Sequence, residues 1–242
     1  MGPVPMHRLP IPVFLLLSAW GCATAPVREP PTPSPALATE GAVTPDARQQ
    51  AVALARRLLG KRTVSWPGQN FPDDCSGLVE GIYASVGMPL QGAAQHGDNG
   101  VTSLYRYAQA RGRIYSSGAP APGDLVFFRD TYDQNRDGVL DDGLTHVALV
   151  ESVSEDGTVA IIHRVRRGVM RYRMNLGHPQ VHTDPRSGSV FNDYLRGSSG
   201  TSRPVLTAQL FVAFASLLPA DVTPGPRPAL PVLAPQPAGG SI

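Results

Sequence analysis

The order of hydrophobic patterns along this 242-residue chain is the feature that most constrains its fold. Apolar residues first recur at helical spacing, over 46–60, 75–87 and 103–112. Short β-rich apolar runs follow at 125–128, 145–153, 158–166 and 168–174. Helices that precede a meander of strands predict an α+β domain, in which an antiparallel sheet carries the N-terminal helices on one side. The run 207–218 fits either a helix or a strand.

Composition confines this domain to residues 45–217. Residues 1–22 combine a short basic region with an apolar run that is too short to span a bilayer comfortably, and they predict a signal peptide. Residues 23–44 are rich in Pro and Ala and predict a disordered tether. Residues 218–242 predict a Pro-rich disordered tail on the same grounds.

The signal-like segment ends in "SAWGC", which resembles the lipobox of bacterial lipoproteins. We therefore expect lipidation of Cys22, export, and a membrane-anchored protein that faces the periplasm or cell envelope. Cleavage near 23–25 and secretion without lipid is the alternative. The net charge of +2 gives no reason to expect a nucleic-acid partner, and we expect a monomer.

The second cysteine, Cys75, begins a helical segment that Asp73 or Asp74 can cap. The free N–H groups and the dipole at a helix N-terminus stabilise a thiolate, which is the nucleophilic form of cysteine. If Cys22 carries lipid, Cys75 has no partner for an intramolecular disulfide. A lone thiol in an exported protein indicates either a catalytic nucleophile or a small, inert core residue.

Two histidines are the candidate partners of this cysteine, because a cysteine nucleophile needs a base that a third group orients. His146 opens the run 145–153, and His163 lies near the end of the run 158–166. The turn 154–157 predicts a hairpin that brings them close to opposite positions on adjacent antiparallel strands. One histidine would accept the thiol proton while the other holds its ring in the required tautomer.

Three sequence blocks together resemble the NlpC/P60 cysteine peptidases, within a papain-like superfamily that includes the CHAP amidases. The blocks are "DDCSGLVEGIYASVGMPL", "PGDLVFF" and "HVALVESVSEDGTVAIIHR", and the resemblance covers roughly 50–165. It implies a papain-like fold with the catalytic cysteine at a helix N-terminus. It further implies that Cys75 is the nucleophile, His146 the base and His163 the group that orients it. The family hydrolyses peptide bonds in bacterial cell-wall peptidoglycan, which is therefore the expected partner.

The resemblance also implies substrate-binding roles for Asp74, Ser76 and Trp66, although Asp74 can equally be an ordinary helix cap. Trp66 and Gly68 loosely match a Y-x-W-G-G-like stretch that shapes the family's substrate site, and the rest of that stretch departs from the pattern. We expect a peptidoglycan endopeptidase that works through a thioester acyl-enzyme. A peptidoglycan amidase or acyltransferase with the same Cys/His pair, or a catalytically silent wall-binding lipoprotein, are the alternatives.

An acidic segment lies between the second block and His146. Asp133, Asn135, Asp137 and Asp141 fall at positions 1, 3, 5 and 9 of an EF-hand-type loop, with Gly138 at position 6. Position 12 is Leu144 where a bidentate glutamate is expected, and Asp142 is the candidate substitute. We expect no flanking helices. A structural calcium ion and a solvated turn are the two interpretations, and no other cofactor is required.

Five arginines surround the turn that follows His163; they are Arg164, Arg166, Arg167, Arg171 and Arg173. Guanidinium groups suit the carboxylates of peptidoglycan stem peptides. Charged side chains also protect an exposed hairpin edge, and this is the competing interpretation.

Overall fold

The computed structural model describes residues 46–198 and 203–219. Three helices come first: α1 (Ala47–Leu58), α2 (Cys75–Ser85) and α3 (Gly100–Arg111). The three predicted helices are confirmed. The last begins at Gly100 because Asn99 caps it, with its Oδ1 accepting the Thr102 N–H at 2.8 Å.

Six strands form one antiparallel sheet, in the order β1-β8-β2-β3-β4-β5. They are β1 (Arg113–Tyr115), β2 (Leu125–Arg129), β3 (Leu144–Val153), β4 (Val159–Val165), β5 (Gly168–Met174) and β8 (Phe211–Ser216). A second, two-stranded sheet contains β6 (Tyr194–Arg196) and β7 (Val205–Leu206). The run 207–218, which the sequence left open, forms the short 3-10 turn η1 (Thr207–Leu210) followed by β8.

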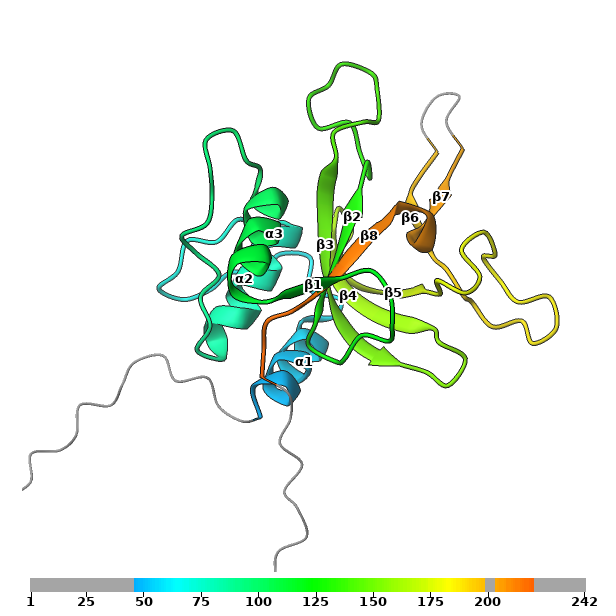
Figure 1. The fold of residues 1–242 in the computed structure, drawn as a ribbon, viewed down its shortest axis with the longest axis horizontal. Coiled ribbons are helices and arrows are strands. Elements are labelled where there is room, and N and C mark those ends of the chain that lie inside the picture. Colours follow the sequence, from blue (N-terminus) through cyan, green and yellow to red (C-terminus); the bar gives the residue numbers. More distant parts are fainter. Residues whose placement is uncertain (1–45, 199–202, 220–242) are drawn as a thin grey trace, which may run out of the picture. The chain divides into compact units, whose positions relative to one another are not determined.

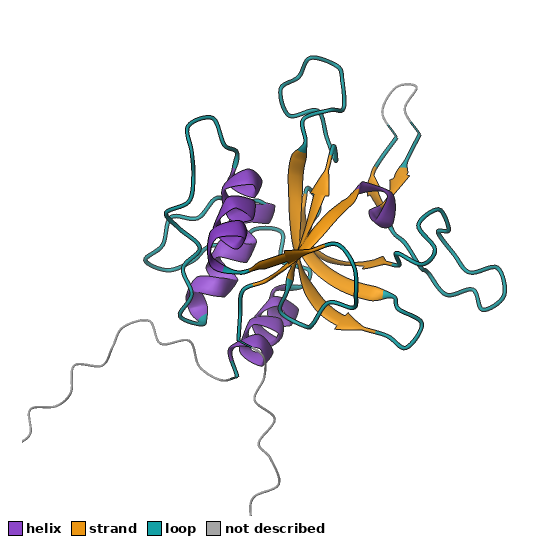
Figure 2. Ribbon diagram, viewed as in Figure 1, coloured by secondary structure: helices purple, strands orange, loops and turns teal. Residues whose placement is uncertain are grey.

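The three helices pack on one face of the six-stranded sheet, as Figures 1 and 2 show. Alternate residues of the central strands, such as Phe127 and Leu149, share a buried cluster with Leu78 and Ile82 of α2. The apolar stripe of α2 therefore faces the sheet, and this sets the direction in which its first residue, Cys75, points. The predicted α+β class, with helices on one side of an antiparallel sheet, is confirmed.

The opposite face of the sheet is also buried. Val126, Ala148 and Val150 form a second cluster there with Leu210 of η1 and Phe214 of β8. Burial on both faces explains why residues 125–128 of β2 and 147–150 of β3 are continuously apolar rather than alternating with polar residues. The segment that carries β6, β7 and η1 lies on this side (Figure 1).

The folded domain extends slightly beyond the predicted boundary at residue 217. Leu218 is buried, and the side chain of Arg48 donates hydrogen bonds to the carbonyl oxygens of Leu218 and Pro219. The same buried guanidinium forms an ion pair with Asp124 at 2.7 Å, so Arg48 of α1 holds residues 218 and 219 against the domain. The predicted signal peptide, Cys22, the tether and the rest of the tail lie outside the described residues. Within those residues, every helix is too short or too polar to cross a membrane.

Candidate active site

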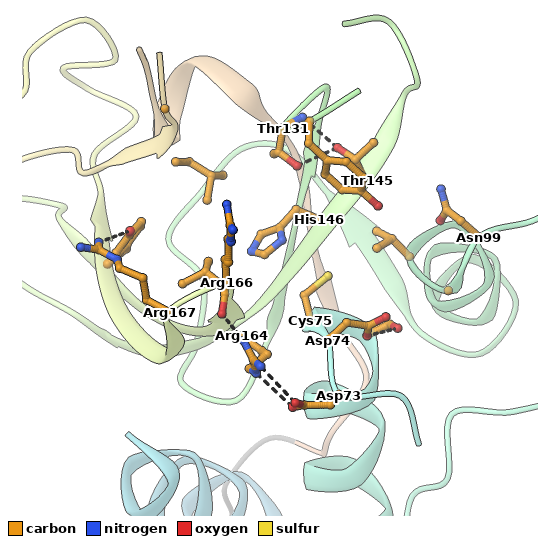
Figure 3. A pocket seen from close by; sticks show the side chains of 18 of the residues that line it. Asp73, Asp74, Cys75, Asn99, Thr131, Thr145, His146, Arg164, Arg166 and Arg167 are labelled. Atoms are coloured by element: carbon orange, nitrogen blue, oxygen red, sulfur yellow. Dashed lines mark hydrogen bonds and ion pairs between the residues drawn. The ribbon is translucent and has the colours of Figure 1, made fainter. Parts of the chain in front are cut away.

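The N-terminus of α2 fixes the position of Cys75. The Oδ1 atom of Asp74 accepts the Gly77 N–H at 3.0 Å and the Ser76 hydroxyl at 2.7 Å. Asp74 is therefore an N-cap, and Cys75 is the first residue of the helix. The half-buried Cys75 lines a cavity of about 830 Å³ (Figure 3).

The hairpin of β3 and β4 brings the two predicted histidines together. The Nε2 of His146 lies 2.8 Å from the Nδ1 of His163, and both side chains are buried. The predicted proximity is confirmed, but the two residues are diagonal neighbours rather than directly opposite. Leu149 pairs with Ile162, and a register shift between Val150 and Ser152 makes the hairpin asymmetric.

The hydrogen bond between the histidines restricts the chemistry available to His146. Its ring faces Cys75 in the cavity (Figure 3), and its Nε2 already bonds to His163. Its Nδ1 is therefore the nitrogen that can accept the thiol proton. That role requires the proton of neutral His146 to sit on Nε2 and the Nδ1 of His163 to accept it, an assignment deduced from the geometry of the pair.

Tyr172 of β5 packs against the far side of this pair. The ring centroids of His163 and Tyr172 are 4.4 Å apart, with an angle of 65° between the rings. The Nε2 of His163 is buried and has no hydrogen-bond partner within the described residues. In the tautomer that His146 needs, this nitrogen carries the hydrogen of His163 and lies on the side of the ring away from His146.

Burial keeps the resting pair neutral. It raises the pKa of Cys75 to about 11, the Asp74 carboxylate adds to this, and the backbone N–H of Val147 opposes it. Burial also lowers the pKa of His146 to about 4 and holds the pKa of His163 well below its usual value. The thiolate predicted at the helix N-terminus is therefore not favoured in the resting site, because desolvation outweighs the backbone N–H groups of Val147, Ser76 and Cys75.

An ion pair that the sequence did not reveal joins the cysteine helix to the histidine strand. The Nε and Nη2 atoms of Arg164 each lie 3.0 Å from a carboxylate oxygen of Asp73. Asp73 also accepts the Val64 N–H, and the guanidinium of Arg164 holds the pKa of this carboxyl below its usual value. The two residues directly precede Asp74 and directly follow His163, so the pair holds both halves of the site together.

The beginning of β3 is held from the other side of the cavity. Thr131 and Thr145 share a hydrogen bond of 2.9 Å between their hydroxyl groups, and both are buried. The side-chain amide of Asn99 donates to the Leu144 carbonyl at 2.9 Å. These contacts fix the backbone next to His146, and none of them followed from the sequence pattern.

The predicted substrate-binding residues have different positions. Ser76 lines the cavity, but it is buried and its hydroxyl is used by Asp74. Asp74 also lines the cavity while it caps α2. Trp66 does not line the cavity: it packs over Gly81, where an added Cβ would lie 2.0 Å from the indole ring. The absence of a side chain at Gly81 lets the indole pack on α2, and a substrate-binding role for Trp66 stays a prediction.

The acidic loop between β2 and β3 uses its carboxylates to form turns. Asp133 accepts the N–H groups of Arg136 and Gly138, and Asn135 and Asp137 each accept the N–H two residues further on. Over 46–198 and 203–219, no three His, Cys, Asp or Glu side chains converge as a metal site would require. Calcium binding by Asp133, Asn135, Asp137 and Asp141 stays a prediction.

The five predicted arginines divide into two groups. Arg171 forms an ion pair with Glu151, and Arg173 forms one with Asp193. These two arginines therefore stabilise the fold around β5. Arg164, Arg166 and Arg167 line the cavity that contains Cys75 and His146.

A cysteine at a helix N-terminus that faces a histidine, which a second buried histidine orients, is the arrangement of papain-like cysteine hydrolases. Residues 66–164 match the family model of the CHAP domain. This match agrees with the resemblance to CHAP-like members of the NlpC/P60 superfamily that the three sequence blocks predicted.

Two solved structures are also similar to this chain. An NlpC/P60 family protein from Bacillus cereus is 17% identical, with a TM-score of 0.41 over 74% of this chain and 43% of that one. NlpC2 from Trichomonas vaginalis is 20% identical, with a TM-score of 0.34 over 52% of this chain and 40% of that one. The matched region thus spans less than half the length of either protein. Among curated proteins, none is significantly similar to this chain.

Proposed function

We propose that this domain is a cysteine endopeptidase that hydrolyses amide bonds in peptidoglycan stem peptides. The observation that carries the proposal is the 2.8 Å hydrogen bond between the Nε2 of His146 and the Nδ1 of His163, which leaves the Nδ1 of His146 for Cys75. The CHAP match supports the class of substrate. The cavity of about 830 Å³ has the size of a site that holds a short peptide.

In the first half of the reaction, the Cys75 sulfur attacks the amide carbon while the Nδ1 of His146 takes the thiol proton. A C–S bond forms and the carbonyl oxygen becomes an oxyanion, for which the Cys75 backbone N–H is a donor. When the C–N bond breaks, the departing amine takes the proton from His146 and a thioester remains. Because the resting pair is neutral, proton transfer accompanies attack rather than preceding it.

In the second half, His146 removes a proton from water, and the resulting hydroxide attacks the thioester. The C–S bond breaks, the sulfur recovers the proton from His146, and the product leaves as a carboxylic acid. His163 is a positioning residue in both halves, since its Nδ1 accepts the Nε2–H of His146 and stabilises the imidazolium.

An amidase that cuts where the stem peptide joins the glycan is the second candidate. It is favoured by Tyr132 and Tyr194, which line the cavity with exposed fractions of 51% and 45%. Exposed aromatic rings with a polar edge are suited to a sugar as well as to a peptide.

Digestion of purified peptidoglycan tests both candidates. Mass spectrometry of the products distinguishes new termini within the stem peptide from an intact peptide released from the glycan. We expect cleavage within the peptide by the wild type and none by Cys75→Ala. If neither fragment forms, or if Cys75→Ala digests as well as the wild type, the domain is not a cysteine peptidoglycan hydrolase.

We also propose that Cys22 is lipidated and anchors the protein to a membrane of the cell envelope. The lipobox-like "SAWGC" supports this. Labelling with radioactive palmitate in a bacterial host is expected for the wild type and not for Cys22→Ala. A mature N-terminus within 23–26 and no label would instead indicate plain secretion.

A further inference from the structure

The cavity has a cationic wall at the turn between β4 and β5. Arg164, Arg166 and Arg167 line it together with Cys75 and His146. Two of these guanidinium groups already have partners in the protein. Arg164 binds both carboxylate oxygens of Asp73 and the Val165 carbonyl, and Arg167 donates to the Tyr172 hydroxyl at 3.2 Å.

Arg166 differs from its neighbours. Its side chain is exposed, and it forms no hydrogen bond or ion pair with any residue in 46–198 or 203–219. Figure 3 shows it extending along the cavity toward the level of His146, whereas Arg164 turns to Asp73 and Arg167 turns away from the cavity centre. The Asp73 carboxylate neutralises Arg164, which leaves this wall with uncompensated positive charge.

The backbone that carries Arg166 is held in place although its side chain is exposed. Val169 forms two backbone hydrogen bonds with the loop that follows α1. Its N–H donates to the Lys61 carbonyl at 2.8 Å, and its carbonyl accepts the Gly60 N–H at 2.9 Å. Gly168 has a φ of +126° and lies so close to Lys61 that an added Cβ would be 2.6 Å from its carbonyl oxygen. A ligand that binds Arg166 therefore has the entropy cost of ordering one side chain but not that of ordering a loop.

We infer that Arg166 binds a free carboxylate of the substrate, on the residue next to the scissile amide. A planar guanidinium can donate two parallel hydrogen bonds to a carboxylate, and it has no equally good match with a carboxamide. Since Arg166 shares one cavity with Cys75 and His146, the carboxylate it binds lies close to the attacked carbon. This inference rests on the proposed function and specifies its substrate as an anionic, unamidated stem peptide.

Two synthetic stem tetrapeptides test the inference: in one the α-carboxylate of D-Glu is free, and in the other it is amidated. We expect the wild type to hydrolyse the free form about 10-fold more efficiently, through KM rather than kcat. Arg166→Gln should lower kcat/KM for the free form to the level of the amidated form, and Arg166→Lys should retain part of the preference. Arg186→Gln is the matched control, because Arg186 is also exposed but does not line the cavity.

Calorimetric binding of the same peptides to Cys75→Ala separates this inference from the proposed function. If the wild type hydrolyses neither peptide but Cys75→Ala binds the free form more tightly, and Arg166→Gln removes that preference, the anion site stands and the hydrolase proposal fails. If both peptides are cleaved and bound equally well, or if Arg166→Gln keeps the wild-type preference, the carboxylate site is overturned while the hydrolase proposal stands.

Discussion

The catalytic groups and the arginines of the β4–β5 turn line the same cavity, but they differ in the number of hydrogen bonds and ion pairs that they form within the protein. On the reaction side, the histidine pair is buried, and Asp73 and Arg164 join its strand to the cysteine helix. On the recognition side, Arg166 is exposed and has no partner among the described residues. The groups that must hold a fixed geometry form hydrogen bonds and ion pairs within the protein, whereas the side chain proposed to bind the substrate forms none.

This difference gives each part a kinetic signature. Substitutions among the buried groups should lower kcat and leave KM nearly unchanged, because they act on the transition state. Substitution of Arg166 should act mainly on KM.

Loss of the nucleophile or the base should have the largest effect. Cys75→Ala and His146→Ala should each lower kcat by about 10⁴-fold or more, and the double variant should be no worse than either single one, because the two residues act as a unit. His96→Ala, in an exposed loop, should hydrolyse stem peptides like the wild type. If His146→Ala retained a tenth of the wild-type kcat, His146 would not be the general base.

The raised pKa of Cys75 predicts a steep pH dependence of its alkylation. With a thiol pKa of about 11, the reaction with iodoacetamide should be slow at pH 7 and should rise by about 10³-fold by pH 10, as the thiolate forms. Mass spectrometry of the labelled protein measures the rate. Rapid labelling that is constant from pH 5 to pH 8 would show a preformed thiolate–imidazolium pair instead.

Loss of the orienting histidine should have an intermediate effect. His163→Ala should lower kcat by about 10²-fold with KM retained, because the Nε2–H of His146 loses its acceptor and the ring loses its preferred tautomer. His163→Asn should be less impaired, since its amide oxygen can accept the same hydrogen. Equal kcat values for the wild type and His163→Ala would mean that the hydrogen bond is only structural.

Removal of the Tyr172 ring should have a smaller effect. Tyr172→Leu should lower kcat by about 10-fold at most, since an aromatic pair contributes about 0.5–1.5 kcal/mol. Tyr172→Phe keeps the ring and should keep kcat. Nitrogen NMR of the histidines should show the hydrogen of His163 on Nε2 in the wild type and in Tyr172→Phe; a hydrogen on Nδ1 would contradict the deduced tautomer.

The smallest effect should follow from breaking the partly exposed ion pair. Asp73→Asn should lower the free energy of unfolding at pH 7 by about 1 kcal/mol. Because the folded-state pKa of Asp73 is lowered, this stabilisation is present above about pH 3.9 and is lost as the pH falls through the folded-state value. Urea unfolding at pH 7 and pH 2 measures the difference, and a gap that persists at pH 2 would exclude the ion pair as its cause.

The sequence was sufficient for those parts of the site that depend on local periodicity. The helix that begins at Cys75 and the hairpin that carries His146 and His163 follow from apolar spacing and turn residues, and the structure contains both. The bond between Arg164 and Asp73 could not be predicted, because the two residues are 91 positions apart and meet only through tertiary packing.

The same limit explains why the packing of Trp66 and the state of the Cys75 thiol could not be predicted from the sequence. Trp66 resembles a substrate residue by its place before the cysteine helix, yet the space above Gly81 determines where its ring packs. The state of the Cys75 thiol depends on desolvation by the surrounding fold, which the charge pattern of one helix does not contain.

Acid quenching during turnover can trap the proposed thioester on Cys75. The wild-type domain, mixed with the unamidated stem tetrapeptide and quenched within milliseconds, is analysed by intact-protein mass spectrometry. We predict a mass increase equal to the acyl half of the peptide, located on Cys75, lost on treatment with hydroxylamine and absent from Cys75→Ala. Turnover of the peptide without any acyl adduct on Cys75, or an adduct of equal yield in Cys75→Ala, would exclude Cys75 as the covalent nucleophile.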